Sequence, residues 1–342
     1  MAMVARAARM IAYDRAMHIV IAHSEPGAGL AWQRELSRRL PELQVSIDPG
    51  CPDGAAGLSG ARLLPASAGL PPADIAVGWK PPADFFSRHP QLQAFFSTGA
   101  GVDHLLRHPG LPAALAVIRL EDAGMGPLMA DYCLHELLRI AGRHDAYAAQ
   151  QRSRQWQELP AFARDDLPVG IFGVGVLGAQ VGAHLARAGF TVRGFARSAK
   201  SIDGIEVMHG EGAWPAFLAA SRVLILLAPH TPETENLIDA AALRQLQPQG
   251  WLINVARGAL VVEADLIAAL DAGQLAGATL DVFRREPLPA DDPLWHHRAI
   301  RITPHVSAPT QVGPSAEQVA GKIEALVRGE RPSGQIDRQR GY

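Results

Sequence analysis

The chain has 342 residues, which is enough for about two domains. Hydrophobic residues make up 48% and charged residues 19%, a composition typical of globular proteins that excludes a disordered chain. The formal net charge of -2 gives no reason to expect nucleic acid or an anionic membrane as a partner. The longest aliphatic run, Val223–Ala228, is too short to cross a bilayer. We therefore expect a cytoplasmic protein with neither kind of partner.

Two features of the sequence carry no functional signal. Residues 1–16 precede the first strand-like run and do not fit the pattern of the rest, so we expect an N-terminal extension that is disordered or upstream of the true start at Met17. The two cysteines, Cys51 and Cys133, have no second Cys or His at a spacing typical of metal ligands. We expect reduced thiols and no metal site.

The first part of the chain alternates strand-like and helix-like segments. A short apolar run at 18–22 indicates a strand, and Trp32, Leu36 and Leu40 recur at the spacing of one helix face. Further strand-like runs lie at 45–47, 75–79 and 92–97. This pattern predicts a parallel sheet covered by helices in a substrate-binding domain over residues 17–116. A final helix over 310–328 is expected to return to this domain, which residues 307–342 would complete.

A long helix over 125–143 is expected to connect this domain to a second one, and residues 150–166 to form an exposed excursion. From Leu167 onward, strands are predicted at 169–172, 191–195, 223–227, 251–255 and 278–282, with helices between them. This alternation of strands and helices is typical of a doubly wound sheet. The sequence therefore predicts an α/β protein of two Rossmann-like or flavodoxin-like domains, with the dinucleotide-binding domain at 117–306.

The turn after the strand at 169–172 has the pattern G-x-G-x-x-G. Gly173 permits a tight turn, Gly175 lets the backbone approach a pyrophosphate, and Gly178 lets the helix pack against the strand. The helix that begins at Val176 and Leu177 would direct its positive end at the phosphates. The pattern in this context predicts a bound dinucleotide.

The end of the next strand distinguishes between two cofactors. NAD enzymes usually place an Asp or Glu there to bind the ribose 2′-hydroxyl, but the segment here contains no acid. It contains Arg197, Ser198 and Lys200 instead, which suit a 2′-phosphate. We therefore predict a preference for NADPH, with NADH as a possible second cofactor.

Three later segments, each after a predicted strand, place chemically useful residues at the edge where α/β folds bind ligands. Arg257 can pair with a substrate carboxylate through two parallel hydrogen bonds and polarise a neighbouring carbonyl. Glu286 beside His305 would favour the protonated imidazole and fix its orientation. The histidine could then give a proton to a carbonyl oxygen as hydride reaches the carbon.

Together these motifs resemble the D-isomer-specific 2-hydroxyacid dehydrogenase family. The resemblance rests on the glycine turn and the segments 254–258, 281–289 and 303–308, and it extends over nearly the whole chain from Met17. Within the family, the segments 96–103, 124–126 and 334–342 resemble the glyoxylate/hydroxypyruvate reductase A branch. The resemblance implies reduction of a small 2-keto acid, glyoxylate to glycolate or hydroxypyruvate to D-glycerate.

The resemblance also implies roles for individual residues, in an active site between the two domains. Arg257 would hold the substrate carboxylate, His305 would donate the proton and Glu286 would orient it. The N–H groups of Ala100 and Gly101 would also bind the carboxylate, and Trp79 would close the pocket or belong to the core. Asp281 would lie near the nicotinamide. Further cofactor contacts are expected from Ala228, Pro229, Val255, Ala256 and Ser307. Relatives of this kind are commonly homodimers.

Two alternatives remain open at this stage. Formate dehydrogenases share the fold but usually carry Gln where this sequence has Glu286. A nucleotide-sensing binding protein is the second alternative, although no basic patch or appended tail in the sequence supports it.

Overall fold

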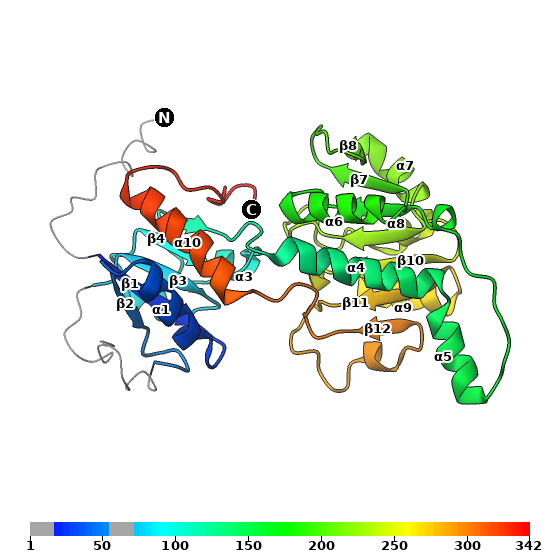
Figure 1. Cartoon of the computed structure of the whole chain (residues 1–342), viewed down its shortest axis with the longest axis horizontal. Helices are drawn as coiled ribbons and strands as arrows, with labels where there is room; N and C mark the ends of the chain where they lie inside the picture. The colour runs from blue at the N-terminus through cyan, green and yellow to red at the C-terminus, as the bar shows by residue number, and fades with distance from the viewer. Residues whose placement is uncertain (1–16, 55–71) are drawn as a thin grey trace. The chain divides into compact units, whose positions relative to one another are not determined.

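The computed structural model describes residues 17–54 and 72–342, so the expected extension at 1–16 lies outside the described residues. The chain divides into two compact units (Figure 1). Unit 1 contains the residues up to Gly124 together with Thr310–Tyr342, and unit 2 is Met125–Pro309. The chain therefore leaves unit 1 once and returns to it. The boundaries expected from the sequence lie a few residues earlier at both places.

Unit 1 is built on a five-stranded parallel sheet with the order β2-β1-β3-β4-β5. The strands are β1 (His18–His23), β2 (Gln44–Ile47), β3 (Ile75–Trp79), β4 (Ala94–Ser97) and β5 (Ala116–Ile118). The helices are α1 (Ala28–Arg39), α2 (Phe85–Arg88), α3 (Asp103–Leu106) and α10 (Val312–Val327). This strand order is that of flavodoxin-like folds.

The returning C-terminal segment completes unit 1. Helix α10 packs against α1, and Arg39 Nη2 donates a hydrogen bond of 3.1 Å to Gly313 O. Beyond α10, Gln335 forms an antiparallel bridge with Ile118, and Ile336 N donates to Val117 O at 2.8 Å. The last residues therefore cover the edge of β5 that would otherwise be free.

Unit 2 contains a seven-stranded parallel sheet with the order β12-β11-β10-β9-β6-β7-β8. Its strands are β6 (Val169–Phe172), β7 (Val192–Ala196), β8 (Glu206–His209), β9 (Val223–Leu226), β10 (Gly250–Asn254), β11 (Leu275–Leu280) and β12 (Ile300–Ile302). Its helices are α4 (Met125–Ala141), α5 (His144–Ser153), α6 (Val176–Arg187), α7 (Trp214–Ala219), α8 (Ala240–Gln245) and α9 (Glu263–Asp271). The chain winds outward in both directions from β6, so the strand order reverses between β6 and β9, where such folds bind ligands.

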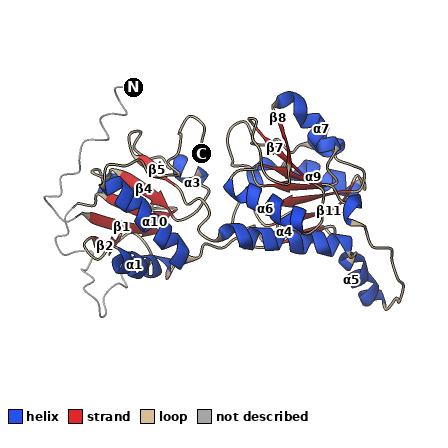
Figure 2. Cartoon of the chain, turned by 45° about the horizontal axis from the view of Figure 1, so that its top comes forward, coloured by secondary structure: helices blue, strands red, loops and turns tan. Residues whose placement is uncertain are grey.

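Helices cover both faces of this sheet (Figure 2). The burial of strand β9 reflects this arrangement. All four of its residues are buried. Val223 and Ile225 belong to the core shared with α4 and α6, whereas Leu224 and Leu226 belong to the core shared with α7, α8 and α9. Successive side chains of a strand point to opposite faces, so a continuous aliphatic run is what a doubly covered strand requires.

The structure corrects the sequence-based elements at several ends. The helix expected over 125–143 ends at Ala141, because Arg143 adopts a left-handed backbone with φ 57°. Part of the excursion expected at 150–166 is helical, since α5 continues to Ser153 although it has no buried residue. The edge strand β8 was not predicted, because it is short and contains no fully buried residue, whereas the strand expected before Thr303 is β12.

In the described part of the chain, no helix is long and apolar enough to cross a membrane. The same residues contain no group of three or more His, Cys, Asp or Glu side chains that could hold a metal ion.

Candidate active site

The functional segments predicted from the sequence share one edge of the unit 2 sheet. The glycine turn follows β6, the basic segment follows β7, and the Arg257 loop follows β10. The Glu286 and His305 loops follow β11 and β12. Because every neighbouring pair of these strands is parallel, all these loops leave from the same carboxyl-terminal edge.

The three glycines of the turn occupy three different environments. Gly173 has φ 103°, and a Cβ there would lie 2.4 Å from Ala228 N. A Cβ at Gly178 would lie 2.0 Å from Gly173 O, so α6 can pack on the turn only without a side chain. In contrast, a Cβ at Gly175 would meet nothing within 4 Å. The first and third glycines are therefore required by packing, whereas Gly175 leaves the backbone open to a ligand.

The surroundings of the turn fit a dinucleotide. Val176 opens the 12-residue helix α6 and is exposed, Leu177 is half-buried, and the free N–H groups at this end of a helix favour a phosphate. Arg197 and Ser198 are exposed directly after β7. Lys200 Nζ donates to Val174 O at 3.0 Å, which ties the basic segment to the glycine turn. The four other expected contacts lie after β9 and β10: Ala228, Val255 and Ala256 are buried and Pro229 is exposed.

Arg257 follows β10 on a loop that is held by hydrogen bonds between the Asn254 side chain and the loop backbone. Asn254 Nδ2 donates to Arg257 O at 2.9 Å, and Asn254 Oδ1 accepts from Ala256 N at 3.1 Å. The half-buried guanidinium donates to Ala256 O at 2.6 Å. A Cβ at the next residue, Gly258, would lie 2.0 Å from the Phe283 carbonyl carbon. The Arg257 loop is therefore in direct backbone contact with the loop that carries Glu286.

Glu286 and His305 form the pair that the sequence predicted. His305 Nδ1 lies 2.9 Å from Glu286 Oε2, and Phe283 N donates to the other oxygen, Oε1, at 3.1 Å. The His305 side chain is 42% exposed and that of Glu286 27%. Because Nδ1 faces the carboxylate, Nε2 is the ring nitrogen left to exchange a proton with a ligand.

Asp281 and Ser307 anchor the loop around His305. The Asp281 carboxylate is fully buried and accepts from Val306 N at 2.8 Å and from Ser307 N at 2.9 Å. Ser307 is buried as well. In this structure both Asp281 oxygens therefore bind groups of the chain itself.

In unit 1, Trp79 lies against the turn that follows β4. A Cβ at Gly99 would lie 2.4 Å from Trp79 Cζ3, and the Trp79 and His104 rings are 3.9 Å apart between centroids. Ala100 and Gly101, the next residues of the turn, are half-buried, as Trp79 is. The three unit 1 residues that the sequence assigned to substrate thus lie at the ends of two adjacent strands, β3 and β4, at one sheet edge.

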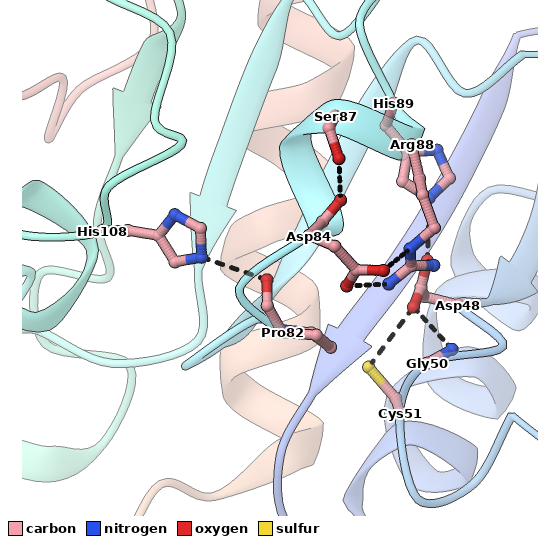
Figure 3. A network of polar contacts seen from close by, with 9 residues as sticks. All are labelled: Asp48, Gly50, Cys51, Pro82, Asp84, Ser87, Arg88, His89 and His108. Carbon is pink, nitrogen blue, oxygen red and sulfur yellow. Dashed lines mark hydrogen bonds and ion pairs between the residues drawn. The ribbon is translucent and has the colours of Figure 1, made fainter.

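The segment after Trp79 is fixed by polar contacts of helix α2 (Figure 3). Pro82 O accepts from His108 Nε2 at 3.0 Å and from Phe85 N at 2.9 Å. Arg88 Nε donates to Asp84 Oδ2 at 2.9 Å, and its Nη1 donates to Asp48 Oδ2 at 2.5 Å. This network of paired side chains holds α2, through its last residue Arg88, against the end of β2.

Both cysteines are free and buried. Burial raises the pKa of Cys51 to about 11, and burial raises the pKa of Cys133 as well. The thiols therefore stay protonated near neutral pH and are poor nucleophiles.

Comparison with known proteins decides the family. The model of the D-isomer specific 2-hydroxyacid dehydrogenase NAD binding domain matches residues 134–307. The chain is 44% identical over 276 residues to a glyoxylate/hydroxypyruvate reductase A of Yersinia enterocolitica, covering 79% of this chain and 88% of the relative. The chain belongs to the D-isomer specific 2-hydroxyacid dehydrogenase family. This confirms the family resemblance, and it makes the protein an NAD(P)-dependent oxidoreductase with a dinucleotide-binding domain in unit 2.

Other members of this 2-hydroxyacid dehydrogenase family match over nearly their whole length. A glyoxylate/hydroxypyruvate reductase A of Klebsiella pneumoniae is 42% identical over 317 residues, 91% of this chain and 96% of the relative. A D-isomer specific 2-hydroxyacid dehydrogenase of Xanthobacter autotrophicus, solved with NADPH and MES, has a TM-score of 0.86 at 37% identity, covering 96% of this chain and 100% of its own. The NADPH-dependent glyoxylate/hydroxypyruvate reductase of Sinorhizobium meliloti, solved with NADP and sulfate, has a TM-score of 0.84 at 33% identity and covers 95% and 100%. These similarities confirm the predicted parallel α/β fold.

Sequence reasoning missed the residues that hold the loops. Arg284 Nη2 donates to Ala259 O at 3.2 Å and its Nε donates to Val261 O at 3.1 Å, so it links the Glu286 loop to the Arg257 loop. Tyr132 on α4 contacts Thr303, two residues before His305. Arg284 adjoins a predicted segment and could have been suspected, whereas Tyr132 gave no signal because it lies far from the loop in sequence.

Proposed function

We propose that the protein reduces small 2-keto acids, glyoxylate to glycolate and hydroxypyruvate to D-glycerate, with NADPH as the preferred hydride donor. The observation that carries this proposal is the His305–Glu286 pair at 2.9 Å, since the loop of Glu286 is in backbone contact with the loop of Arg257. Similarity to reductases named for these two substrates supports the choice of substrate.

In this proposal the chain's own residues hold the keto acid and control one proton. NADPH, when bound, supplies a hydride to the keto carbon. Arg257 binds the substrate carboxylate through two parallel hydrogen bonds and polarises the ketone. Protonated His305 gives the proton on Nε2 to the ketone oxygen, and Glu286 holds the ring through Nδ1. Hydride on carbon and a proton on oxygen complete the hydroxyl group.

We also propose roles for the unit 1 residues. The N–H groups of Ala100 and Gly101 bind the substrate carboxylate, and Trp79 contacts the substrate. The close packing of Gly99 on the Trp79 ring supports this assignment, because it joins the indole to the turn that carries the two N–H groups.

The preference for NADPH rests on the segment after β7. Arg197 and Ser198 are exposed there, Lys200 is tied to the glycine turn, and no acid is available to bind a ribose 2′-hydroxyl. The relatives solved with NADPH or NADP support the same preference. Near the glycine turn, a 2′-phosphate would find charged donors in place of a repelling carboxylate.

The experiment for this proposal is a panel of four keto acids with both cofactors. Glyoxylate, hydroxypyruvate, pyruvate and phenylpyruvate are each offered with NADPH and with NADH, and cofactor oxidation is followed. We expect the highest kcat/KM for glyoxylate or hydroxypyruvate with NADPH. No oxidation with any of the four acids contradicts the activity, and a clear preference for NADH contradicts only the cofactor assignment.

We further propose that two copies associate. Helix α5 has no buried residue, and Trp156, which follows it, is 103% exposed. An isolated helix of this length is marginal in water, and burial of an aromatic side chain at an interface is favourable. A second copy would cover both. Sedimentation of the wild type and of Trp156→Ser measures the oligomeric state of each. We expect the wild type to be a dimer and Trp156→Ser to dimerise more weakly. A monomeric wild type contradicts the proposal.

A further inference from the structure

A single buried carboxylate holds the chain on both sides of His305. Asp281 is 0% exposed, and it accepts from Thr303 Oγ1 at 2.6 Å, before the histidine, and from Val306 N at 2.8 Å and Ser307 N at 2.9 Å, after it. The N–H of His305 itself donates to Asp281 O at 2.9 Å. The whole turn is therefore attached to one residue at the end of β11.

The chain of hydrogen bonds extends from Asp281 to helix α4. Tyr132 Oη lies 2.6 Å from Thr303 Oγ1. Burial raises the pKa of Tyr132, so the phenol keeps its proton near neutral pH. Thr303 has one hydroxyl proton, and Thr303 Oγ1 donates it to Asp281 Oδ1 at 2.6 Å. The direction is therefore fixed: Tyr132 donates to Thr303, and Thr303 donates to Asp281.

The turn needs such support because its backbone is strained. His305 has φ 57°, a left-handed conformation that costs a non-glycine residue free energy. Burial of apolar side chains does not supply the compensation, since His305 is 42% exposed and Val306 is 47% exposed. Hydrogen bonds to Asp281 hold the strained residue instead. Asp281 is in turn linked through Thr303 to Tyr132 on α4.

We propose that Tyr132 and Thr303 are positioning residues for His305, acting through Asp281 to hold the imidazole where it donates its proton. Neither side chain contacts the reacting atoms in this arrangement. The inference rests on the proposed role of His305 as the proton donor. It assigns a function in the reaction to α4, the helix that begins unit 2.

Three variants test the proposal through kcat. Thr303→Val removes the donor to Asp281 while keeping the side-chain volume, and Tyr132→Phe removes only the outer hydroxyl. We expect kcat to fall about tenfold or more for Thr303→Val and by less for Tyr132→Phe, with an unchanged Kd for NADPH. Thr303→Ser keeps the hydroxyl and should restore most of kcat. A wild-type kcat in both Thr303→Val and Tyr132→Phe overturns the proposal.

Thr279 on β11 offers a matched control. Its hydroxyl also donates to a buried carboxylate, Glu136 Oε2, at 2.7 Å, but that carboxylate contacts Arg139 and Arg301, which lie outside the His305 turn at 303–307. Thr279→Val should lower the Tm and leave kcat unchanged. If it lowers kcat as much as Thr303→Val does, loss of stability explains both effects and the positioning role is wrong.

A double-mutant cycle separates this inference from the proposed function. In a His305→Gln background, Thr303→Val and Tyr132→Phe should cause no further fall in kcat, because the group that they position is gone. Equal falls in both backgrounds overturn the positioning role alone. A wild-type kcat in His305→Gln by itself overturns the proposed proton donor. Should Thr303→Val fail to fold, the cycle with Tyr132→Phe gives the same decision.

Discussion

Arg88 in unit 1 and Arg257 in unit 2 are held in different ways. In unit 1, Arg88 is paired with Asp84 and with buried Asp48, so its charge is used within the fold (Figure 3). In unit 2, the loop of Arg257 is held by the Asn254 amide and by backbone contacts. The two arginines therefore differ in what fixes the surrounding chain: carboxylates at Arg88, and an amide side chain with backbone groups at Arg257.

Replacing His305 should have the largest effect on activity. His305→Gln removes the proton donor, and we expect kcat to fall by about 10²- to 10⁴-fold, the usual contribution of general acid catalysis. The NADPH Kd, measured by fluorescence titration, should stay unchanged because the glycine turn is untouched. If His305→Gln binds NADPH more weakly and also has a lower kcat, His305 contributes to cofactor binding and its role is not limited to donating the proton.

Arg257→Lys sharpens the comparison, since it keeps the charge and removes the planar pair of donors. We expect kcat/KM for the keto acid to fall about 10²-fold or more, with little change in the NADPH Kd. The matched control is Arg88→Lys in unit 1, where a paired structural arginine should affect the Tm more than kcat/KM. Intact activity in Arg257→Lys would remove Arg257 from its assigned role.

Arg197→Ala should affect only one cofactor. Loss of a charge-assisted hydrogen bond to the 2′-phosphate should raise the KM for NADPH about tenfold, and the KM for NADH should hardly change. Steady-state kinetics with both cofactors measures the ratio. An equal rise for both cofactors would show that Arg197 contacts a part that they share.

Asp48→Asn should have the smallest effect on chemistry and a clear effect on stability. Burial raises the pKa of Asp48, but hydrogen bonds from His89 and Arg88 outweigh it and hold that pKa below its ordinary value. A carboxyl with a lowered pKa stabilises the fold above its unfolded pKa of about 3.9, and the contribution is lost as the pH falls through the folded pKa. The Tm of the variant should therefore be lower at neutral pH, and the difference should shrink below about pH 4. A difference that is constant with pH would contradict the ionised pair.

The sequence predicted the parts of the site that depend on local patterns. Gly173 and Gly178 are required by close contacts, and the spacing of the turn already indicated this. Glu286 and His305 were expected to pair, because both follow strands that end at one edge. The bond from Tyr132 could not be predicted, since Tyr132 and Thr303 are 171 residues apart in sequence. The strand β8 was not predicted, because it has no apolar run.

The path of the chain has a consequence for how the protein is made. Unit 2 is one continuous segment, Met125–Pro309, whereas unit 1 needs α10 and the residues that cover β5, which are synthesised after unit 2. During synthesis the later half can finish folding while the earlier half still has an uncovered sheet edge. The emerging N-terminal half is therefore the part most exposed to aggregation, and the one on which we expect chaperones to act.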